Sequence, residues 1–162
     1  MMFKKIILIM CLGLIPAAAL MAQDYEYIGA MKCKMCHNSP AKGNQYKIWK
    51  DSKHAHAMEA LKGADATNPK CTKCHSTAAS VSENLWAGIT VKEGVSCESC
   101  HGPGSKYKSM SIMKDRKKAL ANGMIIPTEA TCKKCHNSES PTFKGFDYKT
   151  ALAKIAHPIP KH

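Results

Sequence analysis

The chain has 162 residues, of which 24 are Lys or Arg and 12 are Asp or Glu, so its formal net charge is +12. This length accommodates one domain or two very small ones, and the mixed composition excludes a collagen-like, coiled-coil or wholly disordered chain. Nine cysteines are the unusual feature, and because cysteine chemistry follows the redox compartment, any export signal bears on their interpretation.

The first residues have the layout of a secretory signal peptide. Two lysines precede an apolar run of about ten residues, Ile6 to Ile15, which is too short to span a bilayer. Small residues follow, and cleavage is expected after Ala22. We therefore expect a cleaved signal peptide at 1–22 and a periplasmic or extracellular domain at 23–162 without a stable membrane anchor. An uncleaved N-terminal anchor is the alternative.

Cleavage would remove Cys11, and one motif repeated four times accounts for the eight remaining cysteines. The motif is Cys-x-x-Cys-His. Its cysteines are Cys33 and Cys36, Cys71 and Cys74, Cys97 and Cys100, and Cys132 and Cys135, followed by His37, His75, His101 and His136 respectively.

This spacing is that of a c-type haem attachment site. Two cysteines three residues apart lie about one helical turn apart, so both sulfurs reach the vinyl groups on one edge of a haem and form thioethers. The histidine after the second cysteine then meets the iron from the proximal side. The sequence therefore predicts four covalently bound haem c groups.

Two other cysteine chemistries explain less. A disulfide framework, with 105 ways to pair eight cysteines, gives no reason for a histidine after every pair. Two four-cysteine zinc sites have the same defect. Chance would place histidine at all four positions only about once in 10⁵.

Four further histidines are candidates for distal iron ligands: His54, His56, His157 and His162. For His56 and His162, a solvated surface position is an equal alternative. Methionine ligation is also open, although methionines more commonly pack against porphyrin faces as soft gap-fillers. The methionines are Met31, Met35, Met58, Met110, Met113 and Met124.

Three helices are expected between the motifs. The first covers Gly43 to Leu61, where its wheel puts His54 and His56 on different faces, so they cannot bind the same iron. The second covers Ser109 to Ala121, and the third covers Asp147 to Ala156. Gly88 to Val91 is the one short β-branched stretch and would form a small hairpin at most.

These elements predict a mainly α fold: a small multihaem cytochrome c with short helices, long irregular connections, little strand and a core formed by four haems. The motifs begin 38, 26 and 35 residues apart, an irregular spacing unlike that of a solenoid. About 35 residues per haem cannot build a core of their own, so folding should depend on haem attachment.

Net charge points to redox partners rather than to nucleic acid. Loss of the signal peptide lowers the formal charge from +12 to +10, and propionates of four haems would neutralise much of the remainder. The lysine-rich run from Lys114 to Lys118 is either a docking site for an acidic redox partner or a solvated helix face.

Two segments resemble the tetrahaem cytochrome c-554 family. Trp49 to Lys62 is similar to its W-x-x-[ST]-x-H-A-x-A-x-x-x-L helix, and Gly94 to Gly104 resembles its third haem segment almost residue for residue. The resemblance implies a periplasmic electron carrier. It also implies that His54 is distal to the third haem, whose proximal ligand is His101, and that His157 is distal to the fourth.

The chain departs from the family pattern at the first haem. The family has a histidine shortly after the Gly-Pro-Gly turn, whereas this chain reads Ser105 to Met110. Either the ligand comes from elsewhere, with His56 and His162 as candidates, or the site differs. The resemblance further implies that the second haem, bound by His75, has an open iron.

The leading hypothesis is a tetrahaem electron-transfer protein that is not an enzyme, because iron with two protein ligands has no position for a substrate. One alternative is a haem enzyme that reduces a small nitrogen oxide or hydroxylamine at the open iron of the His75 haem. Another is a homo-oligomer or extracellular filament in which a terminal histidine such as His162 ligates the haem of a neighbouring subunit.

Overall fold

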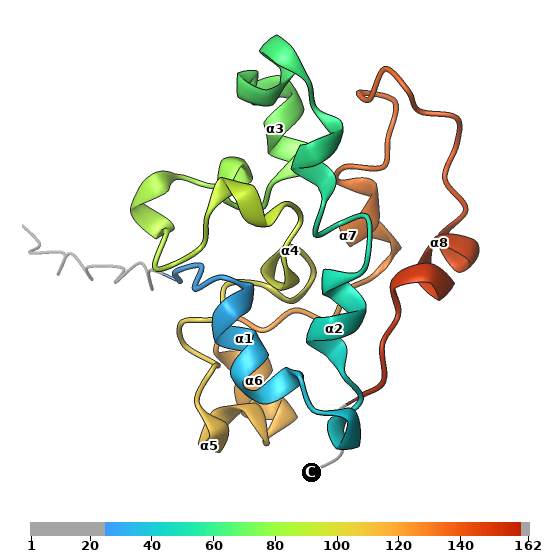
Figure 1. Cartoon of the computed structure of the whole chain (residues 1–162). Coiled ribbons are helices and arrows are strands. Elements are labelled where there is room, and N and C mark those ends of the chain that lie inside the picture. Colours follow the sequence, from blue (N-terminus) through green and yellow to red (C-terminus); the bar gives the residue numbers. More distant parts are fainter. Residues whose placement is uncertain (1–24, 160–162) are drawn as a thin grey trace, which may run out of the picture.

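The computed structural model describes residues 25–159 (Figure 1). The expected signal peptide and His162 lie outside the described residues. The α-helices are α1 (Ala30–His37), α2 (Gln45–Lys50), α3 (Pro69–His75), α4 (Cys97–His101), α5 (Met110–Met113), α6 (Arg116–Ala121), α7 (Glu129–Lys133) and α8 (Tyr148–Ile155). Six 3-10 turns lie between them: η1 (Pro40–Lys42), η2 (Ala57–Ala60), η3 (Gly63–Thr67), η4 (Ala78–Ser80), η5 (Glu83–Leu85) and η6 (Val91–Glu93).

The prediction of a mainly α fold with short helices is confirmed. Over residues 25–159 no strand forms, and β pairing is limited to one isolated bridge between Tyr27 and Trp86. The small hairpin allowed at Gly88 to Val91 is absent from this range. Val91 instead begins the 3-10 turn η6.

The helix expected over Gly43 to Leu61 is interrupted. Helix α2 ends at Lys50, and turns lead to η2. Ser52 Oγ donates to the Trp49 carbonyl at 2.6 Å, a local side-chain bond of the kind that competes with helix continuation. The break sets His54 and Ala55 in a turn, where Ala55 is buried.

The second predicted helix is also divided, and the third is confirmed. Ser109 to Ala121 forms α5 and α6, because Asp115 between them accepts from the Lys118 backbone N–H at 3.0 Å and caps α6. Helix α8 begins after Asp147, whose carboxylate accepts from Thr150 N at 2.7 Å.

The protein core is small. Its cluster of buried residues consists of Ala30, Trp49 and Ala55, with Tyr46 and Cys97 packed against it. Trp49 Nε1 donates to the Val95 carbonyl at 2.8 Å and so ties α2 to the segment that enters α4. A cluster with two alanines buries little apolar area, so much of the interior must be supplied by something other than side chains.

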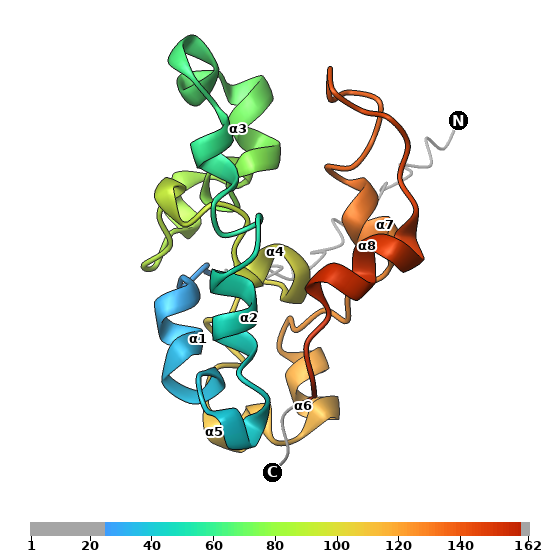
Figure 2. The ribbon, with the colours of Figure 1, turned by 45° about the vertical axis from the view of Figure 1, so that its right-hand side comes forward.

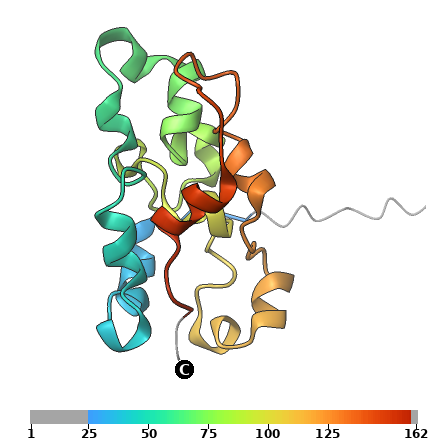
Figure 3. The same ribbon diagram turned by 90° about the vertical axis from the view of Figure 1, so that its right-hand side faces the viewer.

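Helix α4 occupies the middle of the fold. Figure 2 shows it between α2 on one side and α8 on the other. A long loop leaves α7, extends away from the rest of the fold and returns to α8. Helix α8 crosses the middle of the view in Figure 3. Within residues 25–159 no helix has the length and hydrophobicity needed to cross a membrane.

Candidate functional site

Each Cys-x-x-Cys-His motif lies on a helical turn. Helices α1, α3 and α4 each contain a whole motif and end at its histidine. Cys132 lies in α7, and the His136 backbone N–H donates to the Cys132 carbonyl at 3.0 Å, which continues the helical path through the fourth motif. Positions i, i+3 and i+4 share one helix face, so two sulfurs and one imidazole point the same way in each motif.

The four motifs approach one another through their cysteines. The neighbouring Cys33 thiol and burial raise the pKa of Cys97, which places the first motif against the third. Burial and the nearby Cys132 raise the pKa of Cys100, so the third motif lies near the fourth.

The second motif completes the series. Burial and the nearby Cys74 raise the pKa of Cys135 to about 11, which places the second motif against the fourth. In space, the motifs therefore follow the order first, third, fourth, second. None of the eight described cysteines forms a disulfide.

Two pairs of imidazoles face each other between segments far apart in the sequence. The ring centres of His54 and His136 are 6.0 Å apart, and those of His101 and His157 are 5.7 Å apart. The expected pairing was the reverse, with His54 opposite the third motif and His157 opposite the fourth. The contacts differ from that expectation, because the turn after α2 carries His54 beside His136 and the chain after α8 brings His157 beside His101.

The spacing of these rings suits an iron between them. A metal bound by nitrogen on both sides at about 2 Å separates two imidazole centres by roughly 6 Å. Burial, followed by the nearby His136, lowers the pKa of His54. Burial, followed by His157, lowers the pKa of His101. Both effects favour the neutral imidazole, which is the form that binds a metal.

Backbone carbonyls orient two of the motif imidazoles. His75 Nδ1 lies 2.7 Å from the Ala57 carbonyl oxygen, and His101 Nδ1 lies 3.4 Å from that of Ile125. A carbonyl only accepts, so each Nδ1 carries the proton and each Nε2 keeps its lone pair, which is the state that a metal ligand requires. The Phe146 ring also stacks on His136 at 4.9 Å. The sequence motif gave no signal for these partners because they lie on distant segments.

His56 occupies a surface position. Its Nδ1 lies 2.8 Å from Glu59 Oε1 and its Nε2 lies 3.1 Å from the Lys50 carbonyl oxygen. The hydrogen bond to Glu59 raises its pKa. Both ring nitrogens are thus engaged, which favours the surface alternative over ligation.

Methionines gather beside the first motif. A cavity of about 660 Å³ is lined by Met31, Met35 and Met110 together with Cys36 and lysines. The Met31 sulfur accepts from the Tyr46 hydroxyl at 3.4 Å. In the part of the chain that the structure describes, no three His, Cys, Asp or Glu side chains converge in the manner of a bare metal site.

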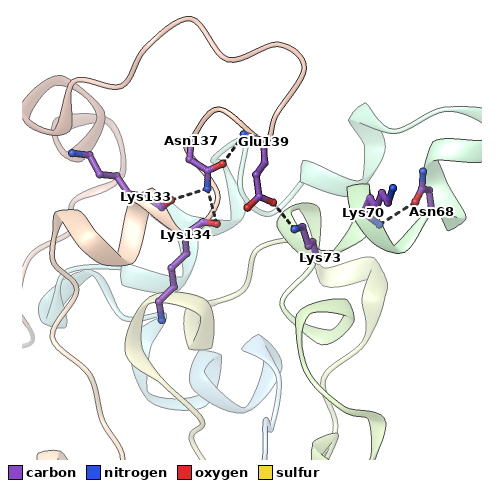
Figure 4. Close-up of polar contacts among 7 residues, drawn as sticks. All are labelled: Asn68, Lys70, Lys73, Lys133, Lys134, Asn137 and Glu139. Atoms are coloured by element: carbon purple, nitrogen blue, oxygen red, sulfur yellow. Dashed lines mark hydrogen bonds and ion pairs between the residues drawn. The ribbon is translucent and has the colours of Figure 1, made fainter.

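A surface ion pair links the second and fourth motifs. Lys73, between the cysteines of the second motif, lies 2.5 Å from a Glu139 carboxylate oxygen (Figure 4). Asn137 holds this loop, because its side-chain amide donates to the Lys133 and Lys134 carbonyls at 2.9 and 3.1 Å, and its oxygen accepts from the Glu139 backbone N–H.

The chain is similar to proteins of one known family. The family model described as cytochrome c554 and c-prime matches residues 32–102, which include the first three motifs. Cytochrome c-554 of Nitrosomonas europaea is 32% identical over 180 residues, covering 86% of this chain and 72% of that protein. No solved structure matches the chain. The chain belongs to the cytochrome c-554 family, and is therefore a c-type cytochrome of electron transport that binds haem c covalently.

Proposed function

We propose that this cytochrome is an exported electron carrier with four haem c groups, one at each motif of the domain at 23–162. The observation that carries the proposal is the series of neighbouring cysteines, Cys33 with Cys97, Cys100 with Cys132, and Cys135 with Cys74. Thioether sulfurs mark the edges of attached haems, so such a series supports a relay that runs through all four motifs.

The residues divide into three roles. The eight motif cysteines form the thioethers, and His37, His75, His101 and His136 are the proximal ligands. His54 is distal opposite His136, and His157 is distal opposite His101, as the facing rings support. Bound haem supplies reversible one-electron chemistry at iron.

The protein's contribution is to fix and shield these ligands. Imidazoles on both sides of an iron leave no position for a substrate, which restricts that site to electron transfer. Two imidazoles also give a lower potential than a methionine and histidine pair. We place the carrier in the periplasm, between a donor and an acceptor that are themselves redox proteins.

Intact mass spectrometry and a redox titration test this proposal. The chain is expressed with cytochrome-maturation machinery, and its mass should exceed that of the cleaved polypeptide by four haems. Reductive titration should then consume four electrons per chain. A mass increase of fewer than four haems, or a signal peptide retained on exported protein, would contradict the corresponding part of the proposal.

Optical spectra separate the alternatives. A high-spin ferric band that responds to nitric oxide would favour the haem enzyme, with the open iron at His75. Concentration-dependent assembly that is lost in His162→Ala would favour the oligomer or filament. An electron carrier is expected to be a monomer whose ligated haems do not react with nitric oxide.

A further inference from the structure

Glu98 is a buried carboxylate inside the third attachment motif. Its side chain is among the most deeply buried, with the residue 2% exposed. One oxygen accepts from the Ile28 N–H at 2.9 Å and from the Gly104 N–H at 2.6 Å, and the other accepts from the Gly29 N–H at 2.8 Å. The carboxylate thus joins the segment that enters α1 to the turn that follows α4.

The hydrogen bonds suit an ionised group. Burial raises the pKa of Glu98, and the three backbone donors oppose that rise. All three partners donate, so each fits a carboxylate oxygen that accepts, whereas a protonated oxygen would itself need an acceptor. Both oxygens accept hydrogen bonds from these donors, and this is the arrangement expected of an ionised carboxylate.

A second carboxylate lies close by. Glu93 accepts from the Ala30 backbone N–H at 2.8 Å, and burial, followed by the nearby Glu98, raises its pKa. No Lys or Arg among residues 25–159 forms an ion pair with either group; the ion pairs described there lie between exposed or half-exposed side chains. Backbone amides offset the cost of burial but leave the negative charge uncompensated by a cation.

This charge lies within the third haem attachment motif and beside the segment that leads into the first. Glu98 directly follows Cys97, and the backbone it holds leads into the helix that carries Cys33, the thiol that neighbours Cys97. Ferric iron carries one more positive charge than ferrous iron, and a nearby anion in a poorly screened interior stabilises the ferric form.

We infer that Glu98, together with Glu93, is a positioning and tuning pair that lowers the reduction potentials of the haems at the first and third motifs. The inference rests on the proposed function, because it requires haem at those motifs. The carboxylates touch no reacting atom. They act through the field they impose and through the backbone they hold.

Potentiometric titration of the matured holoprotein tests the inference. Glu98→Gln removes the charge, while the amide oxygen can still accept from the Ile28 and Gly104 N–H groups. Two of the four midpoint potentials should then rise. Glu98→Asp keeps the charge and should give a smaller shift. Glu83→Gln removes one charge from an exposed position and should leave all four potentials unchanged.

The outcomes distinguish this inference from the proposed function. Intact mass reports haem attachment independently. Four haems with unmoved potentials in Glu98→Gln would overturn the inference alone, and equal shifts in the Gln and Asp variants would show that geometry rather than charge sets the potentials. If Glu98→Gln does not mature, Glu93→Gln replaces it, and the same rise is expected. An absence of any rise there would overturn the inference.

Discussion

His54 and His56 are two residues apart and have opposite environments. His54 is partly buried, with its ring facing His136, whereas His56 is exposed and held by Glu59 and the Lys50 carbonyl. Both residues lie in the turn after α2, where tertiary packing rather than helical periodicity decides which way each side chain points. Of the two, only His54 lies beside a motif histidine.

Replacing these two histidines gives a matched test of ligation. His54→Ala should convert one haem from low-spin to high-spin, because the iron at His136 loses its second imidazole. The haem count should stay unchanged, since the thioethers remain. Absorption and paramagnetic resonance spectra of the holoprotein check this. His56→Ala is the control and should keep the wild-type spectrum, and a new high-spin signal there instead of in His54→Ala would contradict the assignment.

Trp49 is the largest side chain of the small core. Its Nε1–H donates to the Val95 carbonyl, and its ring lies 5.4 Å from that of Tyr46. Trp49→Phe should lower the free energy of unfolding by about 1 to 3 kcal/mol, because a partly buried carbonyl loses its donor.

Denaturant unfolding of the holoprotein measures this loss. Tyr46→Phe is the matched control, because the Tyr46 hydroxyl donates to the exposed Met31 sulfur rather than to a buried group. Its midpoint should change little. Equal destabilisation by the two variants would show that the Trp49 hydrogen bond is not the cause.

At the scale of elements, capping and terminating residues in the sequence predicted where a helix lies better than the apolar periodicity predicted how long it is. Asp147 and Pro158 bracket the third helix, and α8 follows that prediction closely. Periodicity alone suggested a long first helix, yet Ser52 returns its hydroxyl to the Trp49 carbonyl and Ala55 is drawn into the core. Side-chain capping and packing override a 3.6-residue pattern when the pattern itself buries little surface.

The partners of the iron ligands depend on distant contacts. Motif spacing predicts the haem-attaching cysteines and the proximal histidines, because those residues lie within one helical turn. Which distal ring faces which motif depends on how the turn after α2 and the chain after α8 cross the molecule, and sequence similarity suggested the opposite pairing. The Glu98 carboxylate was missed for the same reason, since its three donors come from two segments outside its helix.

The ion pair between Lys73 and Glu139 joins α3 to the loop after α7 (Figure 4). Lys73 lowers the pKa of Glu139 below its usual value of 4.5, so the pair stabilises the fold above that pH. This stabilisation disappears as the pH falls through the lowered pKa. Both groups are exposed, so the effect should be small and should weaken with salt.

A double-mutant cycle in thermal unfolding checks this pair. Glu139→Gln should lower Tm slightly at neutral pH and low salt, and the difference from the wild type should vanish in acid. In a Lys73→Gln background, the same change should have no effect. A Tm difference that persists in acid would contradict the assignment.

At the scale of the whole molecule, the described polypeptide buries few large side chains. Half of the buried hydrophobic residues are alanines, namely Ala30, Ala55, Ala78 and Ala119, whereas several larger apolar side chains remain exposed. The exposed ones include Met31, Met35, Met110, Leu120, Ile125, Ile126, Phe143 and Leu152. An apolar surface of this kind indicates that a further hydrophobic component covers it, and porphyrin faces would do so.

Folding should therefore require haem. The chain produced without cytochrome-maturation machinery should show weaker helical circular dichroism than the holoprotein and should unfold without a cooperative transition, because its own side chains bury too little area to offset chain entropy. The matched comparison is a variant in which alanine replaces both cysteines of the second motif only. It should retain three haems and a cooperative transition at reduced Tm. A haem-free chain that unfolds cooperatively with native helix content would show that the polypeptide forms a sufficient core by itself.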